Sequence, residues 1–183
     1  AKPGLASRLV TVKTDVLELG INPDKGGDIV QAKLLKYFPS KSETSMPIEL
    51  LSYNEDSYQY FQTGLLSLSG LPEPNHQQVF VEKNKKTELR QGQEQISTSL
   101  IWRAKQEQTN LEVVKSYTLK KGRYDILLTY EVKNLGTQDY TFVLYNQLVK
   151  KDTKQERSMF NVETYSFNGP IIYDGDSYEK LDI

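Results

Sequence analysis

Alternating apolar and polar residues between Leu111 and Val132 constrain the fold of this chain more than any other feature. Successive side chains of an extended strand point to opposite faces, so a period of two buries one face and leaves the other in water. The sequence Lys120-Lys121-Gly122-Arg123 divides the stretch into two arms. The apolar faces carry Leu111, Val113, Tyr117 and Leu119 in the first arm and Tyr124, Ile126, Leu128, Tyr130 and Val132 in the second. We therefore expect two antiparallel strands joined by a tight turn.

A third arm, Tyr140 to Val149, follows a second turn at Asn134-Leu135-Gly136-Thr137. It is apolar on both faces between Phe142 and Tyr145, and strands with that pattern are typically covered on both sides. We expect this arm to pair with the second one, which would complete an antiparallel meander of three strands.

Shorter strand-like segments surround the meander, and no long stretch has the period of an amphipathic helix. They are Leu9–Lys13, Val16–Ile21, Ile29–Leu35, Ile48–Leu51, Tyr58–Phe61, Val79–Val81, Glu94–Arg103, Phe160–Phe167 and Ile171–Tyr173. The turn-rich segment Asn22 to Asp28 predicts a hairpin between its neighbours. A chain of 183 residues is long enough for one core. The sequence thus predicts one all-β domain, an antiparallel β-sandwich with little helix over residues 8–183, after a linker at residues 1–7.

Composition excludes several classes of function. The chain has 23 basic and 24 acidic residues, so its net charge of −1 gives no electrostatic case for binding nucleic acid or an anionic membrane. It has no cysteine, which excludes disulfides, thiolate catalysis and cysteine-ligated metals. No apolar run reaches the roughly 20 residues that a membrane-spanning helix needs.

Two motifs could carry chemistry, and both favour an ordinary structural role. A catalytic triad or a two-histidine metal site would have to use the single histidine, His76, which we expect to be a solvated loop residue. The run Asp174-Gly175-Asp176-Ser177-Tyr178-Glu179 spaces its carboxylates like the start of a calcium loop. It lacks the glycine at the sixth position and the glutamate at the twelfth, so a turn is expected instead. No cofactor, no metal site and no enzymatic activity are predicted.

Aromatic residues on the alternating strands, with Trp102, are expected in the core, although aromatic faces also stack on sugar rings. The loop residues Tyr165, Tyr173 and Tyr178 have no clear place in the alternating pattern. Together with Phe167 they form the predicted partner-binding patch, because aromatic residues are enriched at interfaces. The basic run Lys83-Asn84-Lys85-Lys86 is expected to be a solvated hairpin tip that discourages pairing between sheets.

Several segments in a fixed order resemble the periplasmic domain of YidC, the bacterial membrane protein insertase. The resemblance begins with Val12-Lys13-Thr14-Asp15-Val16-Leu17, Gly26-Gly27-Asp28, Leu34 and Tyr37. Its central block is Lys115-Ser116-Tyr117-Thr118-Leu119-Lys120-Lys121-Gly122-Arg123-Tyr124. Asn134, Gln147-Leu148, Phe167-Asn168-Gly169-Pro170, Tyr173 and Tyr178-Glu179-Lys180 follow.

The resemblance implies a β-supersandwich, similar to sugar mutarotases, on the periplasmic side of the inner membrane of a Gram-negative bacterium. It implies a non-catalytic domain that assists the insertion and folding of inner-membrane proteins. The implied partners are the Sec translocon, its SecD–SecF accessory complex and nascent membrane proteins, met by the full-length protein. No cofactor is implied.

The family's periplasmic domain continues past the position of Ile183, so this chain is expected to be its N-terminal portion. An open sheet edge would then invite pairing with a second copy. Two other interpretations stay open. One is a carbohydrate-binding or sugar-epimerising β-sandwich, which the likeness to mutarotases supports and the single histidine disfavours. The other is a plain spacer that holds the geometry of the membrane core.

Overall fold

A computed structural model describes residues 8–41, 44–54, 57–70, 72–84, 87–105, 109–151 and 169–181. The chain divides into two compact units, residues 1–151 and 152–183. The regular structure of the described residues is strand except for one short 3-10 helix, η1 (Pro23–Lys25), so the all-β prediction is confirmed. No helix among them is long and apolar enough to cross a membrane.

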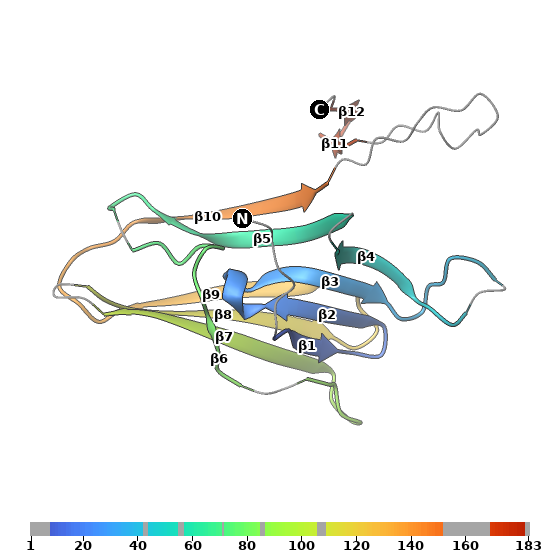
Figure 1. Ribbon diagram of the computed structural model, residues 1–183, viewed down its shortest axis with the longest axis horizontal. Coiled ribbons are helices and arrows are strands. Elements are labelled where there is room, and N and C mark those ends of the chain that lie inside the picture. The colour runs from blue at the N-terminus through green and yellow to red at the C-terminus, as the bar shows by residue number, and fades with distance from the viewer. Residues whose placement is uncertain are drawn as a thin grey trace. The chain divides into compact units, whose positions relative to one another are not determined.

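Six antiparallel strands of the larger unit form one sheet (Figure 1). In spatial order they are β1 (Val10–Lys13), β2 (Leu17–Asn22), β3 (Asp28–Leu34), β4 (Ile48–Tyr53), β5 (Tyr58–Ser67) and β10 (Phe142–Lys150). The predicted hairpin is present, because β2 and β3 pair around η1. Asn22 caps η1 by accepting a hydrogen bond from the Asp24 amide at 3.0 Å.

A second sheet of four strands contains the first two arms of the predicted meander. Its order is β6 (Val81–Glu82), β7 (Gln95–Lys105), β8 (Asn110–Lys120) and β9 (Ile126–Asn134). The alternation is confirmed on β8, where Leu111, Val113, Tyr117 and Leu119 are each at most 1% exposed. Tyr124 is 38% exposed, because it precedes β9 and lies in the turn.

The third arm does not complete the meander. Strand β10 crosses to the six-stranded sheet and pairs with β5 from Phe142↔Ser67 to Lys150↔Gln59. Nor is it covered on both sides, since Leu144 and Leu148 are 52% and 59% exposed. The segment between β9 and β10 spans residues 135–141, which is long enough to reach the other sheet. An apolar pattern on both faces therefore did not mean that both faces are buried.

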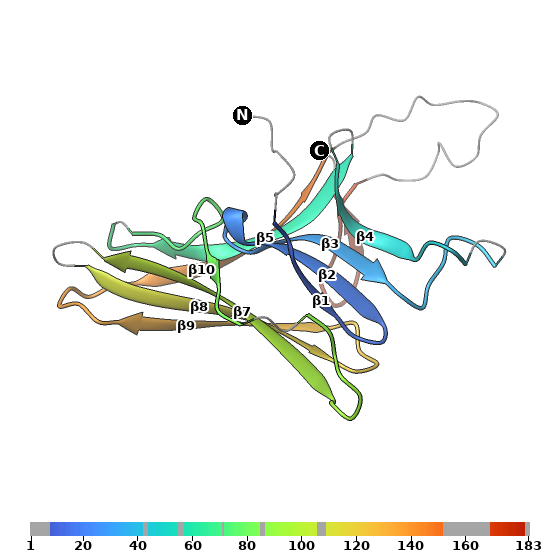
Figure 2. The same ribbon diagram turned by 60° about the horizontal axis from the view of Figure 1, so that its bottom comes forward.

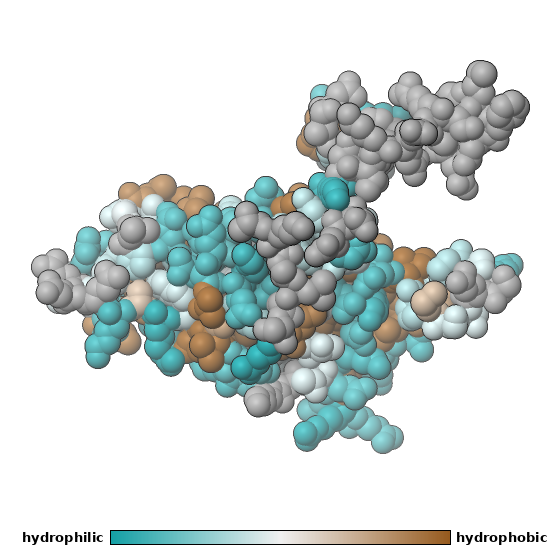
Figure 3. Space-filling view, viewed as in Figure 1, coloured by the Kyte–Doolittle hydropathy of each residue, from teal (hydrophilic) through white to brown (hydrophobic). Residues whose placement is uncertain are grey.

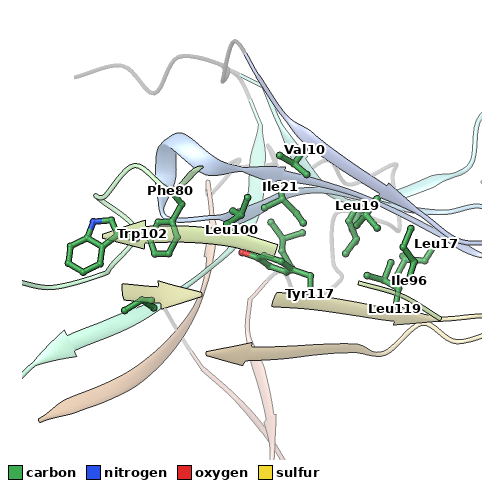
Figure 4. Close-up of a cluster of buried hydrophobic side chains, with 14 of the residues drawn as sticks. Val10, Leu17, Leu19, Ile21, Phe80, Ile96, Leu100, Trp102, Tyr117 and Leu119 are labelled. Atoms are coloured by element: carbon green, nitrogen blue, oxygen red, sulfur yellow. The ribbon is translucent and has the colours of Figure 1, made fainter. Parts of the chain in front are cut away.

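The two sheets of the larger unit pack face to face, with the core between them (Figures 1 and 2). Leu17, Leu19 and Ile21 from β2 meet Ile96, Leu100, Tyr117 and Leu119 from β7 and β8 (Figure 4). Trp102 is 8% exposed, so its predicted place in the core is confirmed. Tyr53, Tyr58 and Tyr60 on β4 and β5 are only half-buried and contact one another, which contradicts the core position expected for strand tyrosines.

The smaller unit contains a hairpin of β11 (Ile171–Tyr173) and β12 (Tyr178–Lys180), of which only β11 was predicted. Between them Asp174 accepts hydrogen bonds from the amides of Asp176 and Ser177 at 2.9 and 2.8 Å. The carboxylate thus caps a turn, as expected. The predicted strand Phe160–Phe167 lies outside the described residues.

Truncating one buried and one exposed leucine tests which of them contributes to the packed core. Leu19 is fully buried, so Leu19→Ala should lower the free energy of unfolding by about 2–5 kcal/mol. Leu127 is 55% exposed, and Leu127→Ala should change it by less than about 0.5 kcal/mol. Urea denaturation of both variants measures the difference, and equal losses would contradict the core described above.

Candidate functional site

Two of the four residues predicted to bind a partner come together in the structure. Tyr173 and Tyr178 are opposite each other on β11 and β12, with ring centroids 4.7 Å apart. They are 56% and 76% exposed. Tyr165 and Phe167 lie outside the described residues, so their part of the prediction is untested.

The exposure of this hairpin follows from its size. Two strands of three residues each cannot bury an apolar face by themselves. Ile171 and Ile172 are accordingly 52% and 49% exposed beside the tyrosines. Adjacent exposed apolar side chains are a mark of interaction surfaces.

An apolar groove of about 760 Å³ lies in the larger unit, between the two sheets. Strands β3, β4, β5 and β10 of one sheet and β9 of the other contribute to its lining. Ile29, Leu51, Phe61, Ile126 and Leu148 are among its lining residues, and none of the lining residues carries a charge. Such a groove can accept apolar side chains of a ligand or polypeptide.

Lys115 on β8 is the centre of a buried polar cluster that the sequence analysis did not identify. Its side chain is completely buried on the face that β8 turns toward the other sheet. The ammonium donates hydrogen bonds to the carbonyl oxygens of Gly26 at 2.8 Å, Thr63 at 3.0 Å and Gly27 at 3.3 Å. The three donors of one ammonium thus meet three acceptors.

These carbonyl oxygens belong to the place where the β3–β5 ladder stops. The two strands pair at Ile29↔Phe61, and the same register would set Asp28 opposite Gln62 and then Gly27 opposite Thr63. Instead the backbone of Gly27 turns toward β2 and donates to the Asn22 carbonyl at 2.9 Å. Lys115 supplies from the opposite sheet the donors that the ladder no longer provides.

Asp28 is the acidic member of the cluster and is 1% exposed. Its Oδ2 accepts a hydrogen bond from Gln62 Nε2 at 3.0 Å, while Oδ1 has no hydrogen-bond partner among the described residues. Burial raises the pKa of the Asp28 carboxyl to about 7, against the hydrogen bond from Gln62 and the charge of Lys115. Burial likewise lowers the pKa of the Lys115 ammonium to about 7, against the attraction of Asp28.

Tyrosines complete the cluster and explain the Gly26-Gly27 pair. The Tyr117 hydroxyl donates to the Gly27 carbonyl, and the Tyr130 hydroxyl lies 3.2 Å from Thr63 Oγ1. Gly26 and Gly27 have φ of +61° and +78°, in the left-handed region that favours glycine. A Cβ on Gly27 would also come within 2.8 Å of Leu100 Cδ1. The turn therefore requires glycine for both backbone and space.

His76 is half-buried rather than fully solvated. Its Nδ1 lies 2.5 Å from the Tyr145 hydroxyl, which also accepts the His76 amide at 3.1 Å. Burial, with the positive charges of Lys25 and Lys115, lowers the pKa of the imidazole. No group of three or more metal-ligating side chains occurs in the described part of the chain. The histidine thus holds its loop to β10.

One signal for the cluster was present in the sequence. Lys115 has the parity of Leu111, Val113, Tyr117 and Leu119, so it is a charged residue on a buried face. Its partners, Asp28 and Thr63, carry no comparable local signal. Only the tertiary structure brings them to Lys115.

Fold and site together define an all-β module with a buried polar cluster and exposed apolar surfaces. Comparison with known proteins is specific, because a sequence profile of the YidC periplasmic domain matches residues 9–183. The chain belongs to the family of YidC periplasmic domains, which confirms the resemblance and its periplasmic location at the inner membrane.

Relatives named membrane protein insertase YidC agree with this assignment. The protein from Coxiella burnetii strain RSA 493 is 36% identical over 180 residues, covering 96% of this chain and 31% of the relative. Those from Methylococcus capsulatus and Pseudomonas fluorescens Pf-5 are 33% and 28% identical, covering 96% and 98% of this chain and 31% of each relative. The chain thus spans about a third of the length of the curated relatives it matches.

Removing the Tyr117 hydroxyl should weaken the cluster. Tyr117→Phe leaves Gly27 with the longer hydrogen bond from Lys115, so we expect a loss of about 1–3 kcal/mol in the free energy of unfolding. Tyr178→Phe is the matched control on an exposed ring and should leave stability unchanged. Chemical denaturation measures both, and an unchanged Tyr117→Phe variant would contradict the structural role of the hydroxyl.

Proposed function

We propose that this chain is a non-catalytic contact domain of a membrane protein insertase. It assists the insertion and folding of inner-membrane proteins with the Sec translocon, through contacts with partner proteins and clients. The observation that carries the proposal is the exposed apolar surface of the β11–β12 hairpin. SecD–SecF is the proposed partner at this surface.

The chemistry of the hairpin supports a protein partner. Tyr173 and Tyr178 offer large rings with a polar tip, a combination enriched at the centres of interfaces. Ile171 and Ile172 add apolar area that the hairpin cannot bury itself. The uncharged groove of the larger unit offers a second surface, to which apolar segments of nascent membrane proteins bind.

The buried charges support a role without catalysis. Lys115 and Asp28 are the opposite charges of the cluster, and they are 0% and 1% exposed. A substrate in solution does not reach them. The sugar-epimerising alternative would need a positioned acid and base, and the ring of His76 is already bonded to Tyr145.

Replacing both hairpin tyrosines tests the proposed surface. The double variant Tyr173→Ser and Tyr178→Ser should weaken binding of the chain to purified SecD–SecF at least tenfold, since buried interface aromatics contribute roughly 2 kcal/mol or more. Its melting temperature should stay within about 1–2 °C of the original, because exposed substitutions seldom matter for stability. Tyr37→Ser, on a residue that is 53% exposed in the larger unit, is the control. Equal loss with the control, or a large fall in melting temperature, would remove the hairpin as the contact surface.

Strand β10 provides a separate test of self-association. Figure 3 shows hydrophobic side chains where β5 ends and β10 begins, and Leu66, Leu68 and Val143 are 40%, 69% and 45% exposed there. Between Phe142 and Val149 the strand has no charged residue, so it lacks the charges that commonly protect an edge strand from pairing with another chain. We propose that β10 pairs with β10 of a second copy.

Light scattering at two concentrations measures this pairing. The mass of the unaltered chain should rise with concentration, and Leu144→Lys should abolish the rise, because a charge on an edge opposes pairing. Leu50→Lys is the matched control, since Leu50 and Leu144 are both 52% exposed and Leu50 lies in β4, inside the sheet. A monomer at both concentrations would contradict the proposal.

A further inference from the structure

The Lys115–Asp28 cluster has properties that the proposed contact function does not use. Burying two opposite charges is costly, and apolar residues of similar volume often stabilise a fold as well or better. Here both charged side chains are buried between the sheets. Their position therefore suggests a role beyond stability.

The cluster also holds a turn and a loop in place. The turn that Lys115 binds donates from the Gly26 amide to the Gln78 carbonyl at 2.7 Å. In return the Phe80 amide donates to the Pro23 carbonyl at 2.8 Å. Loop 72–80 is thus tied to the same turn whose carbonyls face Lys115. Loosening the ammonium from the turn would loosen the loop as well.

We propose that Lys115 and Asp28 form a proton-operated clamp between the two sheets. Its state controls how firmly the Gly26-Gly27 turn and loop 72–80 are held against β8. A proton gained by Asp28 or lost by Lys115 removes one of the two buried charges together with the cost of burying it, and the clamp responds to that change.

Other titratable groups face the pair from the elements packed around it. These are Lys25 on η1, Tyr60 on β5, His76 on loop 72–80, Tyr117 on β8, Tyr130 on β9 and Tyr145 on β10. Burial raises the pKa of Tyr60, Tyr117, Tyr130 and Tyr145, so these hydroxyls stay neutral in the neutral range. Burial lowers the pKa of His76, which opposes folding as the pH falls.

The signs of the two main effects define the response. The Asp28 carboxyl has a folded pKa raised from 3.8 to about 7, so its ionisation removes stability as the pH rises through that window. The Lys115 ammonium has a folded pKa lowered from 10.5 to about 7, so stability returns as the pH rises above 7. The pair therefore makes the clamp weakest near pH 7 and firmer on either side.

Two charge-removing variants separate the effect of Asp28 below pH 7 from that of Lys115 above pH 7. Their stability is measured by thermal and urea denaturation at pH 5, 7 and 9.5. We divide the folding equilibrium constant of Asp28→Asn by that of the unaltered chain. This ratio should be up to about a hundredfold larger at pH 7 than at pH 5, since one proton changes the constant tenfold per pH unit. The same ratio for Lys115→Met should be larger at pH 7 than at pH 9.5 by a similar factor. His76 is present in every chain compared, so its titration is common to both sides of each difference.

Matched controls come from an ion pair on the six-stranded sheet, which also contains Asp28. Lys33 and Glu18 lie 3.3 Å apart and are partly exposed, so Glu18→Gln and Lys33→Met should show no such pH-dependent differences. Differences for Asp28→Asn and Lys115→Met that do not change with pH, or that match the controls, would overturn the proposal.

Hydrogen exchange of the unaltered chain tests the clamp without any variant. After correction for the intrinsic rate, the amides of Gly26 and Phe80 should be least protected near pH 7 and better protected at pH 5 and 9.5. The Val113 amide, in the middle of the β7–β8 ladder, serves as the reference. Protection ratios to this reference that stay constant with pH would overturn the proposal even if both variants failed to fold.

Discussion

The turn at Gly26-Gly27 in the larger unit depends on one buried side chain, Lys115, which reaches from one sheet to the main chain of the other. The β3–β5 ladder ends because the backbone turns at Gly27, and a buried carbonyl left without a donor costs about 1–3 kcal/mol. Lys115 removes that cost at three carbonyls at once. The buried charge is in turn tolerated because Asp28 lies close enough to oppose its loss. Packing alone would hold the sheets together, but it would not fix this turn.

Local sequence pattern was sufficient for elements whose partners are near in the chain. The alternation and the Lys120–Arg123 turn predicted β8 and β9, because a tight turn leaves a strand only its neighbour to pair with. The same reasoning failed for β10, since its pairing with β5 spans a long stretch of chain. The sequence between Phe142 and Val149 does not indicate which strand β10 will pair with.

The candidate site divides in the same way. Tyr173 and Tyr178 could be predicted as exposed because they have no place in an alternating face, and that feature is local. The polar cluster could not, since Lys115 and Asp28 become neighbours only after both sheets have formed. Two segments that carry the family resemblance, Gly26-Gly27-Asp28 and Lys115-Ser116-Tyr117, meet in this cluster. Their contact gives the resemblance a physical reason in this chain.

The two units differ in how far they bury their own apolar side chains. The larger unit has two sheets and can bury leucines fully, so the apolar side chains of its core contribute to folding. The described hairpin has three residues in each strand, which are too few to bury an apolar face by themselves. A partner that covered the exposed apolar side chains of the hairpin would remove them from water, which is favourable. The limit on size that makes the hairpin a poor source of stability thus supports the proposal that it is a contact surface.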